Sequence, residues 1–273
     1  MNTHLNRWKG LALAVIALPL LAACGQARPA PEMAAVEEPA WSPPPLAEEA
    51  GEFPDGREVV RRAIDFMQSH DRLGFEVIAT YEVLQDNGQK LEFYMLQRVA
   101  FEQGSRLYWV TLNDDAATET AWCEGGTFTM IRQPANVWGQ VKVPVSLPNA
   151  ISTVANEYGV SVPFVDILSG DAADLWLGDD VEWVDYIGES WAEGLWTDHV
   201  ALRRPGADIQ LWFRADDEPF PVRMTIIHTN DTGLPSFSAR FREWKTHIPD
   251  GTIPDFEPPE GAERLEIVPV AGR

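Results

Sequence analysis

A strict alternation of apolar and polar residues in the second half of the chain restricts its fold more than any other sequence feature. Ile209, Leu211 and Phe213 occupy every second position, and the same period of two recurs over residues 222–226 and 237–242. Successive side chains of a β-strand point to opposite faces of the sheet, so each run presents one apolar side and one water-facing side. The pattern predicts an antiparallel sheet with one buried face.

Further strand-like runs precede and surround these three. Residues 75–84 and 89–101 flank Asp86-Asn87-Gly88, which is a hairpin signal because type I′ turns need positive φ. Five more predicted strands span residues 106–112, 121–130, 136–143, 181–187 and 196–203. The three alternating runs described above predict strands over residues 209–214, 222–229 and 237–244. Gly125-Gly126 predicts a turn between the two halves of residues 121–130.

Three segments carry helical patterns instead. Apolar residues recur at three- and four-residue spacing over residues 56–70, which predicts an amphipathic helix. Residues 147–158 follow Ser146 as an N-cap and stop before Gly159, as a helix does. Residues 163–177 predict one or two short helices. We therefore expect the helices to cover one face of the sheet.

The order of these elements favours an α+β, β-rich fold built on one sheet. A twisted sheet of this size forms an incomplete antiparallel β-barrel, a half-barrel whose concave apolar face needs helices or a ligand to cover it. Nine tryptophans lie in this domain, and the alternative is that they only fill its core. The candidate residues that line a hydrophobic ligand are Phe93, Trp109, Trp122, Trp138, Leu211, Phe213, Met224, Ile226 and Phe241.

The N-terminus has the pattern of a bacterial signal peptide. Arg7 and Lys9 precede an apolar run that ends at Ala23 and is too short for a permanent membrane span. Leu21-Ala22-Ala23-Cys24 resembles a lipobox, in which the cysteine receives a diacylglyceryl thioether. We expect residues 1–23 to be removed and Cys24 to be the lipid-attachment site. A plain signal peptide with an incidental cysteine is the alternative.

Two further segments follow the signal peptide. Residues 24–53 are rich in Ala, Pro and Glu and predict a flexible tether, whereas residues 54–273 predict the folded domain. Without residues 1–23 the formal charge changes from −21 to −23, because two basic residues and no acidic one are lost. This charge makes nucleic acid and anionic lipid headgroups poor long-range partners. Cys123 is the one cysteine after Cys24, so a lipidated chain forms no internal disulfide.

Five motifs occur in the order found in a family of uncharacterised predicted periplasmic proteins, which the chain resembles from about residue 57 onward. They are Gly88–Leu91, Asn156–Val160 with Pro163–Leu168, Asp208–Phe213, Phe220–Arg223 and Pro258–Ala262. The family is similar in fold to the lipoprotein carrier LolA and the receptor LolB. The resemblance implies lipid or acyl-chain handling by analogy of fold. Thr197-Asp198 precede His199 where members often carry a cysteine, so no metal or thiol role is transferred.

Catalytic and cofactor motifs are weak in this sequence. Gly188-Glu189-Ser190-Trp191-Ala192 approaches a hydrolase nucleophile elbow, but the next run is strand-like, so a turn between two strands is favoured. The five histidines are dispersed and lack zincin spacing. Acidic pairs such as Asp114-Asp115 lack the spacing of a calcium loop. We expect no enzyme activity, no metal and no cofactor.

The sequence thus leads to two functional hypotheses. The first is a periplasm-facing lipoprotein, anchored to the outer membrane through Cys24, that binds an acyl chain, lipid or other hydrophobic envelope molecule. Its anchor in the inner membrane stays an alternative, although Gly25 resembles the pattern for outer-membrane delivery. The second is an envelope sensor or interaction module with a self-filled core and an envelope protein as partner. An esterase that uses Ser190 is a distant third.

Overall fold

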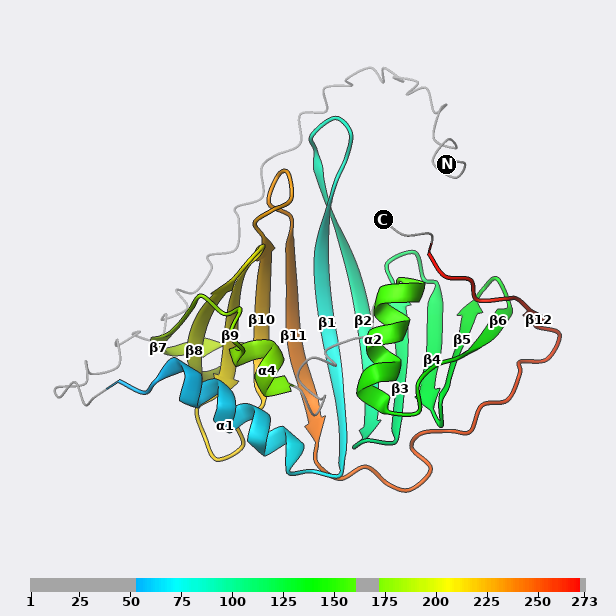
Figure 1. Ribbon diagram of the computed structural model, residues 1–273, viewed down its shortest axis with the longest axis horizontal. Helices are drawn as coiled ribbons and strands as arrows, with labels where there is room; N and C mark the ends of the chain where they lie inside the picture. The colour runs from blue at the N-terminus through cyan, green and yellow to red at the C-terminus, as the bar shows by residue number, and fades with distance from the viewer. Residues whose placement is uncertain (1–52, 161–171, 271–273) are drawn as a thin grey trace, which may run out of the picture. The chain divides into compact units, whose positions relative to one another are not determined.

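The computed structural model describes residues 53–160 and 172–270. One 12-stranded sheet runs through this part of the chain, and no pairing between described residues joins its two ends (Figure 1). In spatial order, the strands are β12 (Glu263–Arg264), β6 (Val137–Lys142), β5 (Thr127–Gln133), β4 (Thr118–Glu124), β3 (Arg106–Asn113), β2 (Lys90–Glu102), β1 (Arg72–Leu84), β11 (Ser236–Lys245), β10 (Pro221–His228), β9 (Ala207–Arg214), β8 (Leu195–Arg204) and β7 (Trp183–Ala192).

Neighbouring strands pair antiparallel, except for the short parallel pair of β12 with β6. The predicted alternation holds in β9, where Ile209, Leu211 and Phe213 are buried and the residues between them are half-buried. Residues 121–130 form parts of two separate strands, β4 and β5, because the Gly125-Gly126 turn reverses the chain completely. The predicted incomplete antiparallel β-barrel with helices on one face is confirmed.

Helices α1 (Gly56–Gln68), α2 (Leu147–Tyr158) and α4 (Ala172–Leu177) lie on the same face, which we call the inner face (Figure 1). Asp55 caps α1, since its carboxylate accepts a hydrogen bond from the Arg57 backbone N–H at 2.9 Å. The helix contacts β7 and β8, whereas α2 contacts β4 and β5. Gly159 ends α2 with φ of 67°, as predicted for a left-handed C-cap. Most of the short helical segment predicted over residues 163–177 lies outside the described residues.

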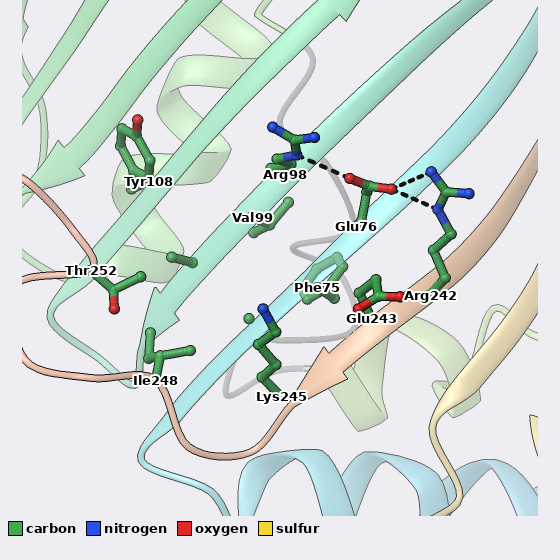
Figure 2. Close-up of a pocket in the computed structure, with 12 residues that line it drawn as sticks. Phe75, Glu76, Arg98, Val99, Tyr108, Arg242, Glu243, Lys245, Ile248 and Thr252 are labelled. Carbon is green, nitrogen blue, oxygen red and sulfur yellow. Dashed lines mark hydrogen bonds and ion pairs between the residues drawn. The ribbon is translucent and has the colours of Figure 1, made fainter.

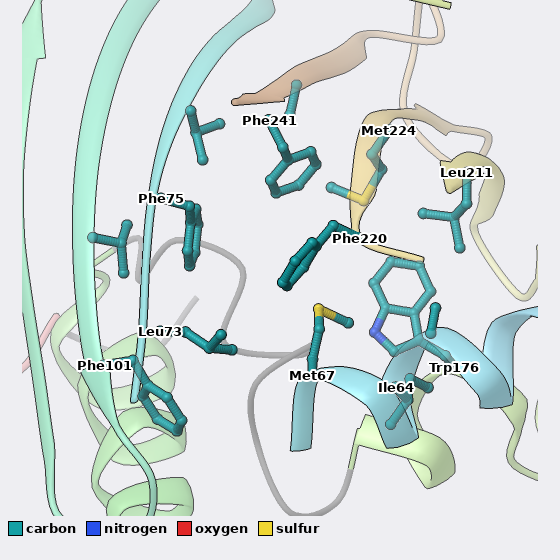
Figure 3. Close-up of a cluster of buried hydrophobic side chains, with 14 of the residues drawn as sticks. Ile64, Met67, Leu73, Phe75, Phe101, Trp176, Leu211, Phe220, Met224 and Phe241 are labelled. Atoms are coloured by element: carbon teal, nitrogen blue, oxygen red, sulfur yellow. The ribbon is translucent and has the colours of Figure 1, made fainter. Parts of the chain in front are cut away.

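The main hydrophobic core fills the space between the inner face and the helices (Figure 3). Apolar side chains of α1, including Ile64 and Met67, meet Leu73 of β1 and Phe220, which directly precedes β10. Each such side chain stabilises the fold by about 1.5–3 kcal/mol when fully buried. The core therefore holds α1 on the sheet without a disulfide, since Cys123 is the one cysteine among the described residues and is free.

The chain after β11 covers one edge of the sheet, and we call residues 246–270 the C-terminal strap. Ile248 and Ile253 pack on the outer face against Trp122, whose Nε1 donates a hydrogen bond to the Pro254 carbonyl at 2.9 Å. The strap then pairs with β6 through β12 and returns to the inner face, where Ile267 joins the main core. Because an open strand edge invites aggregation, the strap protects the β6 edge.

Candidate functional site

Five of the predicted ligand-lining residues lie inside the main core. Trp109, Leu211, Phe213, Met224 and Phe241 are each 2–5% exposed and pack against other buried side chains (Figure 3). They share the inner face, as the alternation predicts. These five side chains contact other side chains of the protein and are core residues, so they expose little surface to a ligand.

An apolar row crosses the inner face beyond this core. Cross-strand register places Ile226 opposite Phe237, Phe237 opposite Tyr81, and Tyr81 opposite Phe93. These four residues, which we call the inner row, come from β10, β11, β1 and β2 and are all half-buried. The rings of Tyr81 and Phe93 stack with centroids 5.6 Å apart. The inner row is therefore a continuous apolar surface that is still partly open.

The side chains of the inner row are uncharged, which suits contact with an apolar group. Burial raises the pKa of the Tyr81 phenol, and the charges of Asp114, Asp115 and Glu119 raise it further, so this side chain stays neutral. Covering apolar surface that is still exposed to water stabilises a complex by about 25 cal/mol per Å².

Sequence reasoning named Phe93 and Ile226 but missed Tyr81 and Phe237, although the hairpin turn at Gly88 sets the register that pairs Tyr81 with Phe93.

The expectation that Trp122 and Trp138 share this apolar face is wrong. Ala121 and Cys123 point into the main core, so Trp122 between them points to the outer face. Trp138 packs there against Phe256 of the C-terminal strap, with the rings tilted and their centroids 5.1 Å apart. Both faces of this region are apolar because the strap covers the outer one. Alternation therefore could not assign the two tryptophans to a face.

The outer face carries a pocket of about 620 Å³ between β1, β2, β11 and the C-terminal strap (Figure 2). Gly74 and Ala100 leave the sheet surface free of large side chains, while Tyr108 and Ile248 form part of the walls. Lys245 also lines the pocket. The pocket is thus apolar at its base and charged at its rim.

A half-buried carboxylate organises that rim. Glu76 accepts hydrogen bonds from Arg98 Nε at 3.0 Å and from Arg242 Nε at 2.6 Å (Figure 2). Burial works to raise the pKa of Glu76, but the hydrogen bonds and charges of the two arginines outweigh it and hold the pKa below its usual range. The carboxylate therefore stays ionised and fixes both guanidinium groups.

Ser190 has no catalytic partners in the described structure. It lies within β7, and the turn that follows falls at Glu193-Gly194 rather than within residues 188–192. Its Oγ lies 3.1 Å from Thr197 Oγ1. His199 bonds Gln210 on the outer face, whereas the carboxylate of Asp198 binds Arg62 of α1 on the inner face. A serine–histidine–aspartate relay does not form from these residues.

The remaining candidates for reactive chemistry are also inert in this arrangement. Burial raises the pKa of the Cys123 thiol to about 11, with a smaller effect from Glu124, so the thiol stays protonated. Within residues 53–160 and 172–270, no three His, Cys, Asp or Glu side chains gather as a metal site. The helices of this same part of the chain lack the length and apolar character needed to cross a membrane.

Solved structures with related folds are distant in sequence. An uncharacterized conserved protein from Thermus thermophilus has 11% identity and a TM-score of 0.45, covering 77% of this chain and 98% of that one. The lipoprotein LppX of Mycobacterium tuberculosis has 13% identity and a TM-score of 0.41, covering 71% and 96%. A LolA superfamily protein from Nitrosomonas europaea has 10% identity and a TM-score of 0.33, covering 72% and 96%.

Sequence comparison identifies the family directly. No curated protein matches the chain. A family model described as "Predicted periplasmic protein (DUF2092)" matches residues 56–268, which include all the strands and helices described above. This match agrees with the family resemblance seen in the sequence motifs. The chain belongs to the DUF2092 family of predicted periplasmic proteins.

Proposed function

We propose that this protein is a membrane-anchored periplasmic lipoprotein that binds an acyl chain, a lipid or another hydrophobic envelope molecule on the inner row. The observation that carries the proposal is the half-buried row of Ile226, Phe237, Tyr81 and Phe93, which continues the apolar core across four adjacent strands. A ligand that lies across this row completes the burial of its side chains. The driving force is then the hydrophobic effect, with no charged group required.

The anchor in this proposal is Cys24, which lies outside the described residues. Its support is the Leu21-Ala22-Ala23-Cys24 motif after an apolar run. A lipid group on Cys24 would hold the binding domain near the membrane, and Gly25 favours the outer membrane. A membrane thus serves as the first partner and as the source of hydrophobic ligand.

A second candidate function is an interaction module for an envelope protein. It is favoured by the exposed edge strand β7, where Trp183 is 47% and Trp191 is 61% exposed. Trp183 points to the outer face, whereas Trp191 and Glu189 share the inner face of this strand. Glu189 has no ion-pair partner among the described residues. The core of this alternative is filled by the protein's own side chains, as Trp109 and Phe213 illustrate.

Lipid binding is tested by native mass spectrometry of the full chain, followed by titration with a fluorescent fatty acid. Ile226→Gln places a polar amide in the inner row and should weaken binding by about tenfold. Ile227→Gln is the matched control, because Ile227 is the next residue on β10 and points to the outer face. Equal affinity of both variants and the wild type, or an empty protein that takes up no fatty acid, would favour the interaction module.

A further inference from the structure

Two arginines lie directly opposite each other on adjacent strands of the outer face. Arg223 of β10 pairs with Arg240 of β11 in the antiparallel register. Both side chains face outward, because Met224 and Ala239 beside them point into the main core. Side chains paired in this way have Cβ atoms about 4.5–5.5 Å apart, and like charges at such positions destabilise a sheet. The repulsion within such an arginine pair is relieved when an anionic group lies beside it.

The two guanidinium groups are poorly neutralised by the protein. Arg240 has one carboxylate partner, Glu193, at a long 3.4 Å, and its side chain is 57% exposed. Arg223 forms no ion pair with any residue in the described part of the chain. Its Nε is buried and has no acceptor among those residues. A buried charged donor without an acceptor costs free energy, so the guanidinium of Arg223 is not compensated by the protein at this atom.

Aromatic packing holds Arg223 in place. Its guanidinium carbon lies 5.1 Å from the ring centroid of Trp212, and Trp212 stacks on His199 with centroids 4.3 Å apart. Burial lowers the pKa of His199, a hydrogen bond with Gln210 opposes this change, and the charge of Arg223 lowers the pKa further. The neutral imidazole and the indole face accept the cation but supply no anionic partner. Arg223 is therefore oriented and still able to bind an acceptor.

Hydroxyl donors and open space adjoin the pair. Thr225 and Ser238 form the next cross-strand pair on the same face, with hydroxyl oxygens 3.4 Å apart. The Ser238 hydroxyl also donates to the Met224 carbonyl at a long 3.5 Å, so a ligand replaces these weak contacts when it binds the hydroxyl groups. A pocket of about 400 Å³ lies beside Arg240 and is also lined by Arg214 and Arg242, together with the carboxylates of Glu193 and Glu243. Those two arginines are already bound to carboxylates, Arg214 to Asp216 and Glu218 and Arg242 to Glu76. Of these four arginines, Arg223 and Arg240 are the two least neutralised by carboxylates.

We propose that Arg223 and Arg240, with the hydroxyl groups of Thr225 and Ser238, form an oxyanion site on the outer face that binds a phosphate group. Guanidinium groups form charge-assisted hydrogen bonds with phosphate oxygens, and hydroxyl groups can donate to the remaining oxygens. The phosphate is either free or part of a lipid headgroup. The site lies on the opposite face from the inner row, so it stands whether or not the inner row binds a hydrophobic ligand.

The test is a titration of the full chain, kept in a neutral detergent, with inorganic phosphate. Sodium chloride at matched ionic strength separates specific binding from screening. Phosphate should raise the melting temperature of the wild type, and Arg223→Gln and Arg240→Gln should each weaken phosphate binding by roughly tenfold or more. Arg203→Gln is the charge-matched control, because Arg203 is exposed and pairs with Asp208. This variant should bind phosphate like the wild type.

The protein without phosphate provides a second measurement. Removing one of two like charges should leave Arg240→Gln at least as stable as the wild type in chloride, so loss of its phosphate response cannot come from unfolding. If Arg223→Gln fails to fold, Arg240→Gln and Ser238→Ala decide the question. A phosphate response absent from the wild type, or equal in the wild type and Arg240→Gln, would overturn the site.

The source of the phosphate is settled by competition in the same assay. Dihexanoyl phosphatidylglycerol carries an anionic headgroup, and dihexanoyl phosphatidylcholine carries a neutral one at the same chain length. If the first displaces inorganic phosphate and the second does not, the site accepts an anionic lipid headgroup. If neither displaces it, the site is specific for free phosphate. Either of these two results supports the oxyanion site. Loss of fatty-acid binding in Ile226→Gln with phosphate binding intact would show that the two sites are separate.

Discussion

Arg62 of α1 donates a hydrogen bond to the carboxylate of Asp198 on β8 at 2.8 Å. The other carboxylate oxygen accepts a hydrogen bond from the Tyr186 hydroxyl at 3.0 Å. Asp198 is a buried charged residue, whereas Arg62 is half exposed at its side chain. This three-residue network fixes α1 against the edge of the sheet where β7 and β8 pair.

Removing the carboxylate should loosen this contact. We expect Asp198→Ala to lower the free energy of unfolding by about 1–3 kcal/mol, because it leaves the Tyr186 hydroxyl without its acceptor. Tyr186→Phe removes one neutral donor and should cost less, about 1 kcal/mol. Urea unfolding of both variants measures the difference. Wild-type stability in Asp198→Ala would mean that apolar packing alone docks α1.

The Glu76 network makes a prediction about pH. In the folded state the pKa of Glu76 lies below its ordinary value of 4.5. Folding therefore stabilises the ionised carboxylate relative to the protonated form. Its stabilising contribution is complete above the unfolded pKa and is lost as the pH falls through the folded pKa. Glu76→Gln should therefore be less stable than the wild type at pH 7, by about 1–2 kcal/mol. The gap should close below about pH 4, as measured by urea unfolding across that range.

The lipid anchor gives a cellular prediction. Acyl chains contribute about 0.8 kcal/mol per buried methylene, so a diacylglyceryl group on Cys24 would hold the chain firmly at a membrane. Cys24→Ser should therefore move the protein from the membrane pellet to the soluble fraction. Blotting also has to show that the signal peptide was cleaved in the variant. A processed variant that stays in the pellet after a salt wash must be anchored by another part of the chain.

The strands were most predictable where one face of the sheet meets water. In β9 and β11 the alternation separates buried positions from half-buried or exposed ones, so the sequence indicated both the strand and the orientation of Phe213 and Phe241. In β4 the pattern failed, because Trp122 is buried on the outer face while its neighbours are buried on the inner one. Periodicity reports burial and cannot distinguish two buried faces.

The C-terminal strap was not predictable from local patterns at all. Its prolines, such as Pro254 and Pro258, exclude regular periodicity, and its contacts join residues far apart in the sequence. The inner row was partly predictable: the turn at Asn87-Gly88 aligns Tyr81 with Phe93, but Phe237 reaches them only through the long-range pairing of β1 with β11. The oxyanion site needed the same kind of information, because Arg223 and Arg240 meet only through the register of β10 and β11.

Gly139 allows the last prediction, because the C-terminal strap passes directly over it. A Cβ at this position would lie 2.9 Å from the Leu265 carbonyl oxygen and 2.7 Å from the Ile267 side chain. Gly139→Ala should push the strap off β6 and lower stability by about 1–3 kcal/mol. Hydrogen exchange should accelerate at the Leu265 amide, which donates to the Trp138 carbonyl at 2.8 Å. The amide of Val99 in the centre of the sheet should exchange as in the wild type. Equal acceleration at both amides would indicate global destabilisation instead of release of the strap.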